Sequence, residues 1–437
     1  MRRVPIAVGV IVIVVGLLLS FIAYDVEETG ESRVLTAFRG PMVTFPVRAA
    51  IARGEREIWT LTWFTFKPPP TMAMALAKAQ VLAMAQQVII DYGGYTRFVI
   101  PAFGVAAQVI PAENIYLAAA MPIIAGIEYD RVIRVPIQST SGVGGTYLSI
   151  DEVMELVDVE ELWEIGRGEG MDIAVLDSGA PRDLRIASIA AADEGTNPYD
   201  DFGHGGSVIH IIHSISPQAR IHSIKVLDQY GMGRISTILK GLEMALHLEP
   251  RPDIVHASLG ASPTLFDSLS MAFETAVRSY GVVAVAAAGN DPTYESSPAS
   301  SPLVVSVGAI GSDLKLTDYS APSFNVVSIG DQKVIWLGSV QLMRGTSFSS
   351  PIVSAQLLDY MSGTGVMPEE FDEIATLLIG SELTVEGHSM PSGVELAAAD
   401  PVAETPLMVK LAPWLTVVGV GAVIALVAVF WRRKRVI

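Results

Sequence analysis

Short apolar runs alternate with helical segments between residues 171 and 309, and this alternation restricts the fold more than any other feature of the chain. The runs are MDIAVLD (171–177), RIHSIKVL (220–227), DIVHASL (253–259), VVAVAAAG (282–289) and LVVSVGA (303–309). Helices are expected at about 204–215, 236–248 and 265–279. Continuous apolar runs separated by helices indicate a parallel sheet that is covered on both faces. The sequence therefore predicts an α/β domain whose functional groups gather at the carboxyl ends of the strands.

Four polar residues stand where such a sheet could bring them together. Asp177 ends the first run, His204 begins the helix that follows, Asn290 ends AAAGN, and Ser347 lies in GTSFSSP (345–351). A nucleophilic serine needs a base, an acid that orients the base and an oxyanion donor. Taken singly, a serine before a helix is usually a cap and an aspartate after a strand is usually a turn residue. Taken together, in the order Asp, His, Ser, these residues indicate a hydrolytic triad.

The chain resembles the subtilisin-like serine proteases over about residues 151–403. The resemblance rests on AVLDSG, GHGGSV, VLDQYGMGRISTILKGLEMAL, SLGA, AAAGN, PASSPLVVSVGA, TDYSAPS and GTSFSSP. It implies that Asp177 orients the imidazole of His204, which acts as general base and then acid while Ser347 forms an acyl-enzyme. Asn290 would help to hold the oxyanion. The resemblance also implies two substrate-binding walls that pair with an extended peptide. They are Ser258, Leu259 and Gly260, and Ala287, Ala288 and Gly289.

The chain departs from the family pattern near the expected cleft. The departures replace a histidine by Gly206, a threonine by Ser207, a methionine by Phe348, a histidine by Ile352 and an asparagine by His256. None of these positions carries one of the four chemical roles, but they bear on the shape of the cleft and on the rate. The small alanines along one wall favour a large apolar side chain before the cleaved bond.

Residues 30–138 are expected to form a small α+β domain. Its strands are predicted at 57–66 and 123–135, with a strand pair or one long bent strand at 95–109, and its helices at 72–90 and 111–120. Residues 97–136 resemble the inhibitory propeptide of these proteases, which implies a ferredoxin-like unit whose carboxyl tail fills the cleft. An unrelated membrane-proximal domain is the alternative. A linker follows at 139–150, and its segment STSGVGGT (139–146) is a place where a protease could cut.

Both ends carry uncharged apolar runs, 4–24 and 411–431, each long enough to cross a bilayer core of roughly 30 Å as a helix. Arginines precede the first run and basic residues 432–435 follow the second. The positive-inside rule then predicts that both termini are cytoplasmic and that the catalytic domain lies on the extracytoplasmic side of the cell membrane. A cleaved signal peptide is the alternative for the first run.

Composition excludes several classes of partner. A formal net charge of −17 and the lack of a basic stripe argue against nucleic acid, and the absence of cysteine excludes disulfides and thiolate metal sites. His210 and His213 have no third ligand cluster, and the GHG turn argues against a carboxylate dyad at Asp200 and Asp201, so no metal or cofactor is assigned. The acidic loop 193–201 is a candidate for structural calcium, but it lacks an EF-hand spacing that would assign the ion.

The sequence as a whole predicts a membrane-anchored serine endopeptidase that hydrolyses polypeptides. Its expected partners are its substrates, the lipid bilayer and its own propeptide-like domain. The alternatives are a catalytically silent peptide-binding receptor or scaffold on the same fold, and an esterase with the same mechanism.

Overall fold

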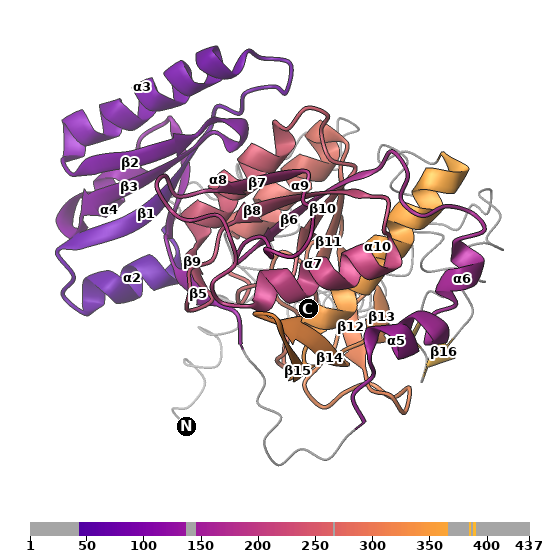
Figure 1. Ribbon diagram of the computed structural model, residues 1–437. Helices are drawn as coiled ribbons and strands as arrows, with labels where there is room; N and C mark the ends of the chain where they lie inside the picture. The colour runs from indigo at the N-terminus through magenta and orange to yellow at the C-terminus, as the bar shows by residue number, and fades with distance from the viewer. Residues whose placement is uncertain (1–42, 137–145, 265–266, 366–383, 386–387, 390–437) are drawn as a thin grey trace, which may run out of the picture.

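The computed structural model describes residues 43–136, 146–264, 267–365, 384–385 and 388–389 (Figure 1). Both predicted spans, 4–24 and 411–431, lie outside these residues, as do most of the linker and the expected domain boundaries at 30 and 403. Among the described helices, none combines the length and the apolar character that a membrane crossing requires.

The larger domain contains a seven-stranded sheet in the order β13-β12-β11-β10-β6-β8-β7. Each described pairing in this sheet is parallel, so the prediction of an α/β domain with a large parallel sheet is confirmed. The strands are β6 Asp172–Asp177, β7 Ser188–Ala191, β8 Arg220–Lys225, β10 Ile254–Ala257, β11 Val283–Ala287, β12 Val305–Ile310 and β13 Val326–Ile329. Of these strands, β7 and β13 were not predicted from the sequence.

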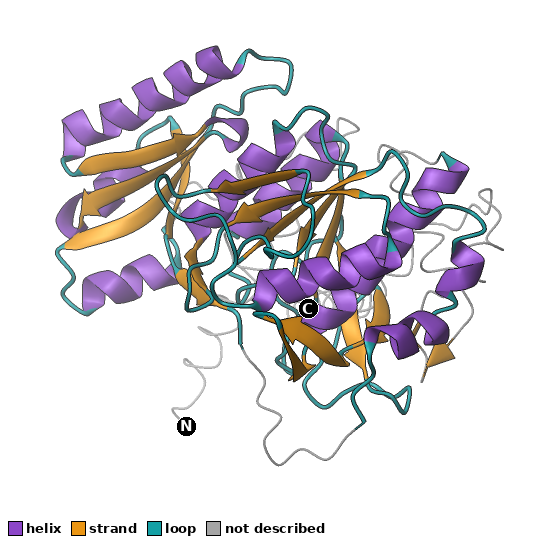
Figure 2. Ribbon diagram, viewed as in Figure 1, coloured by secondary structure: helices purple, strands orange, loops and turns teal. Residues whose placement is uncertain are grey.

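Helices cover both faces of this sheet (Figure 2). On β6, Ile173 and Val175 pack with α7 (His204–Ile215) and α10 (Thr346–Thr364), whereas Ala174 and Leu176 pack with α8 (Ile235–Leu246) and α9 (Ser268–Tyr280). This alternation follows from the period of two in a strand. The short helices α5 (Ile150–Leu156) and α6 (Val159–Leu162) join the α7 and α10 face. A hairpin, β14 (Asp331–Trp336) and β15 (Ser339–Arg344), precedes α10, and a two-stranded pair, β16 (Thr384–Val385) and β17 (His388–Ser389), follows it.

The upstream unit, residues 43–129, forms a four-stranded antiparallel sheet in the order β2-β3-β1-β4. Its elements are α2 Phe45–Ala52, β1 Glu57–Phe64, α3 Met74–Tyr92, β2 Tyr95–Ile100, η2 Pro101–Phe103, β3 Val105–Pro111, η3 Ala112–Asn114, α4 Ile115–Ala119 and β4 Ile124–Tyr129. Of these elements, α2 was not predicted from the sequence.

Both faces of the upstream sheet are buried. On β1, Ile58 and Phe64 pack with the unit's own helices, while Leu61 and Trp63 pack with residues of α8 and α9 in the larger domain. The upstream unit therefore shares one apolar core with the larger domain and lies beside α8 and α9 (Figure 1).

The segment after β4 does not continue the upstream sheet as predicted for 123–135. The chain turns at Asp130, whose carboxylate accepts hydrogen bonds from the backbone N–H and the hydroxyl of Ser236, at 2.9 and 2.8 Å. Beyond this turn, β5 (Val132–Arg134) pairs antiparallel with β9 (Met232–Arg234) of the larger domain. The prediction of one continuous strand was wrong because this carboxylate binds the start of α8 instead.

Candidate active site

Asp177 and His204 form a buried pair at the carboxyl end of β6, where α7 begins. His204 Nδ1 lies 2.8 Å from Oδ1 and 2.9 Å from Oδ2 of Asp177, and the exposed fractions of the two residues are 2% and 1%. The backbone N–H of Ser178 also donates to Oδ1 of Asp177, at 2.6 Å. A carboxylate held in this way fixes the ring orientation and requires the proton on Nδ1, which leaves Nε2 as a base.

The turn that carries His204 is ordered by Asp200. The carboxylate of Asp200 accepts hydrogen bonds from the backbone N–H groups of Phe202, Gly203 and Gly206. Gly203 has a φ of 111°, and a Cβ added there would lie 2.3 Å from the indole Nε1 of Trp336. Only glycine satisfies both conditions, so the glycine before His204 is required by the backbone and by the neighbouring ring. Asp200 thus accepts hydrogen bonds from the backbone of the turn and does not form a carboxylate dyad with Asp201.

Ser347 lies in the first turn of α10 and lines the cavity that the predicted walls form. Its Oγ donates to the backbone oxygen of Ser258 at 3.2 Å, and the ring of the next residue, Phe348, is centred 5.8 Å from that of His204. His204 Nε2 is buried and has no hydrogen-bond partner among the described residues. The structure therefore brings Ser347 to the region of the pair, with its hydroxyl bonded to the wall rather than to the imidazole.

Asn290 is held with its amide nitrogen free to donate. Its Oδ1 accepts from the backbone N–H and from the hydroxyl of Thr346, at 2.8 and 2.9 Å. Because a backbone N–H can only donate, these bonds fix which end of the amide is the oxygen. Nδ2 is consequently available beside the start of α10, where the early backbone N–H groups, including that of Ser347, lack partners within the helix.

A cavity of about 430 Å³ lies between the predicted walls and reaches Asn290 and Ser347. Its lining includes 258–260 from one wall, Ala287 and Gly289 from the other, and both Asn290 and Ser347. Residues 131–136, which follow the upstream unit, line the same cavity. We refer to residues 131–136 as the tail. The structure thus places the chain's own extended segment along the predicted walls.

A further strand beside this cleft, β9, was not predicted from the sequence. It pairs with the tail over Met232–Arg234, and Val135 adds a hydrogen bond from its N–H to Gly231 O at 2.9 Å. The signal for it was the glycine spacing in YGMGR, since glycines allow another backbone to approach closely.

Aromatic rings around His204 were also missed. Trp336 and Phe202 lie with ring centroids 6.3 and 6.4 Å from that of His204. Trp336 belongs to the β14 and β15 hairpin, and no local pattern in the sequence indicated that it would reach the imidazole. Together with Phe348, these rings shield His204 from solvent.

His256, one of the departures from the family pattern, is buried and hydrogen-bonded to a residue of one cleft wall and to a residue of α10. Its ring bonds Ser354 Oγ and Ser258 Oγ, each at 2.8 Å, and Ser258 Oγ in turn donates to the backbone oxygen of Ser347 at 2.9 Å. Burial lowers the pKa of His256 to about 3. The ring is therefore neutral at physiological pH, and it joins the wall to the start of α10.

Replacing His256 by asparagine should make the free energy of unfolding depend less steeply on pH between pH 6.5 and 3. In the unfolded chain a histidine binds a proton below its ordinary pKa of 6.5, whereas His256 in the folded chain does not until about pH 3. Its contribution to the free energy of unfolding is thus lost as pH falls from 6.5 to 3, by up to about 1.4 kcal/mol per pH unit. Urea unfolding of the full chain, made inactive by Ser347→Ala, would measure it. The exposed His247→Asn is the control; equal slopes for His256→Asn and its parent would contradict the assignment.

The remaining polar residues that the sequence offered as candidate site residues are either paired with a charged side chain or partly buried. His210 Nε2 pairs with the exposed Asp183 at 3.1 Å, and burial lowers the pKa of His213. Asp201 pairs with the buried Lys225. In the described part of the chain, no group of three or more His, Asp or Glu side chains is arranged to hold a metal ion.

The amino-acid sequence of this chain is similar to those of several known proteins. A family model described as the Subtilase family matches residues 184–373, which include His204, Asn290 and Ser347. A subtilisin of Bacillus pumilus is 30% identical over 210 residues, which cover 43% of this chain and 75% of that protein. The chain belongs to the subtilase family. The minor extracellular protease Epr of Bacillus subtilis (strain 168) is 34% identical over 229 residues, 46% of this chain and 34% of Epr.

The chain spans only part of several of these subtilases. Subtilisin E of Bacillus subtilis (strain 168) is 31% identical over 210 residues, which cover 43% of this chain and 54% of that protein. The matched parts thus amount to about one third of Epr and about half of subtilisin E.

Proposed function

We propose that this subtilase is a serine endopeptidase that cleaves polypeptides through an acyl-enzyme. The observation that carries the proposal is the buried Asp177 and His204 pair, whose imidazole lies against Phe348, the residue next to Ser347. Ser347 and Asn290 line the cavity between the predicted walls. Nε2 of His204 takes the proton of Ser347 Oγ as this oxygen attacks a peptide carbonyl. Asn290 Nδ2 and the Ser347 N–H donate to the oxyanion. The imidazolium then protonates the leaving amine, and a water molecule hydrolyses the acyl-enzyme by the same route.

One observation favours a second candidate, a silent peptide-binding scaffold. Ser347 Oγ is bonded to Ser258 O and not to His204 Nε2. Catalysis requires a rotation of the Ser347 side chain toward Nε2, and such hydrogen bonds are often made only when substrate is bound. A scaffold requires no such rotation.

The test of the proposed activity is hydrolysis of fluorogenic peptides and matching esters by the full chain, after the upstream unit has been released. We expect peptide cleavage that Ser347→Ala abolishes. Cleavage of esters alone would favour an esterase, and binding of peptides without any cleavage would favour the scaffold.

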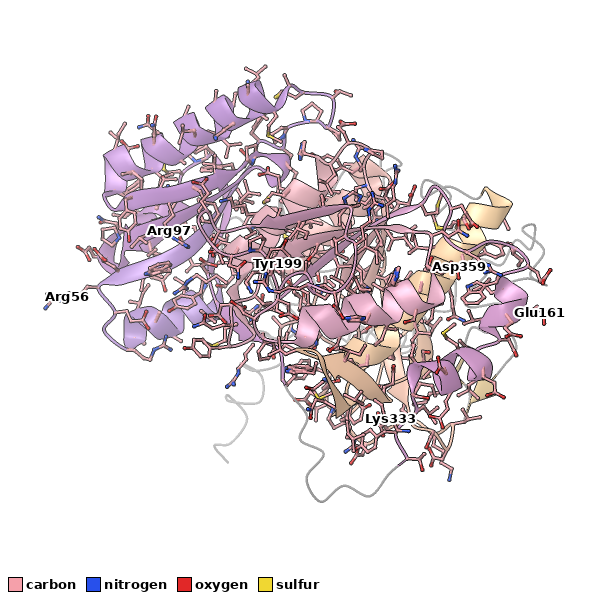
Figure 3. The ribbon with its side chains drawn as sticks, viewed as in Figure 1. Arg56, Arg97, Glu161, Tyr199, Lys333 and Asp359 are labelled. Carbon is pink, nitrogen blue, oxygen red and sulfur yellow. The ribbon has the colours of Figure 1, made fainter. Side chains whose placement is uncertain are left out.

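We further propose that the upstream unit is a ferredoxin-like propeptide that inhibits the enzyme through its tail. The succession β-α-β-β-α-β and the order β2-β3-β1-β4 support the ferredoxin-like assignment. Pairing of β5 with β9 along the cleft supports inhibition, because a substrate would need the same strand edge. Glu128 of the unit and Asp130, which directly follows it, accept hydrogen bonds from the first turns of α9 and α8. These bonds support a role of the unit in folding of the larger domain. Arg97 (Figure 3) donates to Asp130 at 3.0 Å.

Docking of the upstream unit should weaken as pH rises. Burial raises the pKa of Glu128 and of Glu243, which accepts from Ala102 N–H across the interface, to about 7 from 4.5. If the pKa of each carboxyl returns to its ordinary value on release, the docked state binds more protons than the separated state between pH 4.5 and 7. The dissociation constant should then rise by up to about tenfold per pH unit for each group in this window.

The measurement uses the full chain carrying Ser347→Ala and cut in the linker, with dissociation followed on dilution at pH 5 and pH 7.5. Glu128→Gln combined with Glu243→Gln should remove most of the pH dependence, while the exposed Glu113→Gln should leave it intact. Tighter docking at the higher pH would contradict the assignment.

We propose that the enzyme is anchored in the cell membrane, with the larger domain on the extracytoplasmic side and both termini cytoplasmic. The apolar runs 4–24 and 411–431 and their basic flanks support this orientation. Cutting within 139–146 would release the first run with the upstream unit and leave the second as the anchor. Sequencing the amino terminus of the mature protein tests this proposal: a start within or just after 139–146 is expected, and a start at Met1 or near Asp25 would contradict it.

A further inference from the structure

The large sheet carries a second hydrogen-bonded line of a serine, a histidine and an aspartate, which the proposed mechanism does not use. Ser188 Oγ lies 2.7 Å from His222 Nδ1, and His222 Nε2 lies 2.7 Å from Asp172 Oδ1. Asp172 begins β6, Ser188 begins β7, and His222 lies near the start of β8, which runs between those two strands. Asp177 ends β6, so about 16 Å of this strand separates the second line from the candidate active site.

The register of the sheet brings the three side chains together. Ser188 lies opposite His222 in the pairing of β7 with β8, and His222 lies opposite Ala174 in the pairing of β8 with β6. Residues directly opposite in neighbouring strands, and residues two apart in one strand, project from the same face of a sheet. Since Asp172 and Ala174 are two apart, all three polar side chains project from one face at the amino end of the strands.

The surroundings of Asp172 decide which ring nitrogen of His222 carries the proton. Asp172 is 2% exposed, and its Oδ2 forms an ion pair with the guanidinium of Arg220. Its backbone N–H donates to Oδ2 of Asp253 at 2.7 Å, which fixes the start of β6. A carboxylate paired with arginine can only accept, so Nε2 of His222 donates to it and Nδ1 is left as an acceptor. Ser188 Oγ therefore donates to Nδ1, which can take up its proton.

Ser188 holds the contact with a base that Ser347 lacks, since Ser347 Oγ is bonded to the backbone oxygen of Ser258. It is also open to small reagents, because β7 lies at the edge of the sheet and each of its residues is only partly buried (Figure 1). The three residues of the line supply a nucleophile, a base and an orienting acid, but no oxyanion donor. They therefore suit a carbonyl with a good leaving group rather than a peptide bond.

We propose that Ser188 is a second nucleophile of this chain, which accepts the acyl group of small activated esters. Ser188 Oγ bonds to the carbonyl carbon of the ester while its proton passes to His222 Nδ1. The bond between this carbon and the leaving oxygen breaks, and its electron pair departs with that oxygen. Asp172 accepts from Nε2–H of the imidazolium until the other ring proton passes to the leaving oxygen or to water. The product is an ester on Ser188, and its formation does not involve Ser347.

The test treats the full chain carrying Ser347→Ala with p-nitrophenyl acetate, and mass spectrometry of its peptides follows acetylation at each serine. We expect Ser188 to be acetylated at least about tenfold faster than the exposed Ser300 of the same molecules. His222→Gln removes the base and should lower the rate at Ser188 to about that at Ser300. The exposed His247→Gln is the control and should leave the rate at Ser188 unchanged.

The comparison of Ser188 with Ser300 is made within one folded chain, so it decides the proposal even if His222→Gln fails to fold. Acetylation of Ser188 no faster than that of Ser300 would overturn the proposal and leave the line as a tether of β7. An unchanged rate in a His222→Gln variant with the urea unfolding curve of its parent would overturn it as well. Neither result bears on peptide cleavage by Ser347, which this variant lacks.

Discussion

Replacing Asp177 by asparagine should lower kcat for peptide hydrolysis by about 10⁴-fold. The carboxylate of Asp177 accepts from His204 Nδ1 at 2.8 Å inside the protein, where little water can replace it. An asparagine amide could donate to Nδ1 and so move the ring proton to Nε2, which would no longer accept the proton of Ser347. The size of Asn matches that of Asp, so the fold should persist. Steady-state kinetics on a fluorogenic peptide would measure the loss.

Asp183→Asn is the matched control for this experiment. Asp183 also pairs with a histidine, His210, but its own side chain is 59% exposed. We expect its kinetics to match those of the parent. A small effect of Asp177→Asn, comparable to that of Asp183→Asn, would show that His204 does not depend on Asp177.

Replacing Asn290 by aspartate should lower kcat by at least about 10²-fold with little change in KM. Aspartate retains the oxygen that accepts from Thr346, so the local backbone should hold. It removes the Nδ2 donor and adds negative charge where an oxyanion would form. The interaction is made in the transition state and not with the bound substrate, which is why the loss should fall on kcat.

The exposed Asn197→Asp introduces the same chemical change away from the cleft and serves as the control. A rise in KM with unchanged kcat for Asn290→Asp would show that Asn290 binds substrate without stabilising the oxyanion. In that case the second oxyanion donor would have to be sought elsewhere near the start of α10.

Local pattern was enough to predict the parts of the site that lie next to regular elements. Asp177 ends a continuous apolar run, His204 lies between glycines at a helix start, and Ser347 lies shortly before Pro351 at the start of another helix. Each of these signals is contained in a few neighbouring residues, and the strand and helix periods fix where each side chain emerges. For the same reason the large sheet was predictable from its apolar runs, whereas β7, which is only partly buried, was not.

Features that depend on distant partners were beyond local pattern. The turn at Asp130 forms because Ser236, more than a hundred residues later, offers an N–H and a hydroxyl to its carboxylate. Trp336 reaches His204 through a hairpin whose position is set by packing and by a hydrogen bond from Ser207 Oγ to Ile335 O. Ser296 lines the cavity between walls that follow separate strands, close to Gly260 and Gly289. None of these pairings leaves a periodic trace in the sequence.

Fluorophosphonate labelling of Ser347 tests the central claim most directly, since the reagent reacts with a serine only when its hydroxyl is activated by a base. Mass spectrometry of the full chain, before and after the linker is cut and the upstream unit released, would locate the adduct. We predict slow labelling of Ser347 before release, rapid labelling after it, and none in the His204→Ala variant. No adduct on Ser347 after release, or equal labelling of the His204→Ala variant, would contradict the assignment of these residues as one catalytic unit.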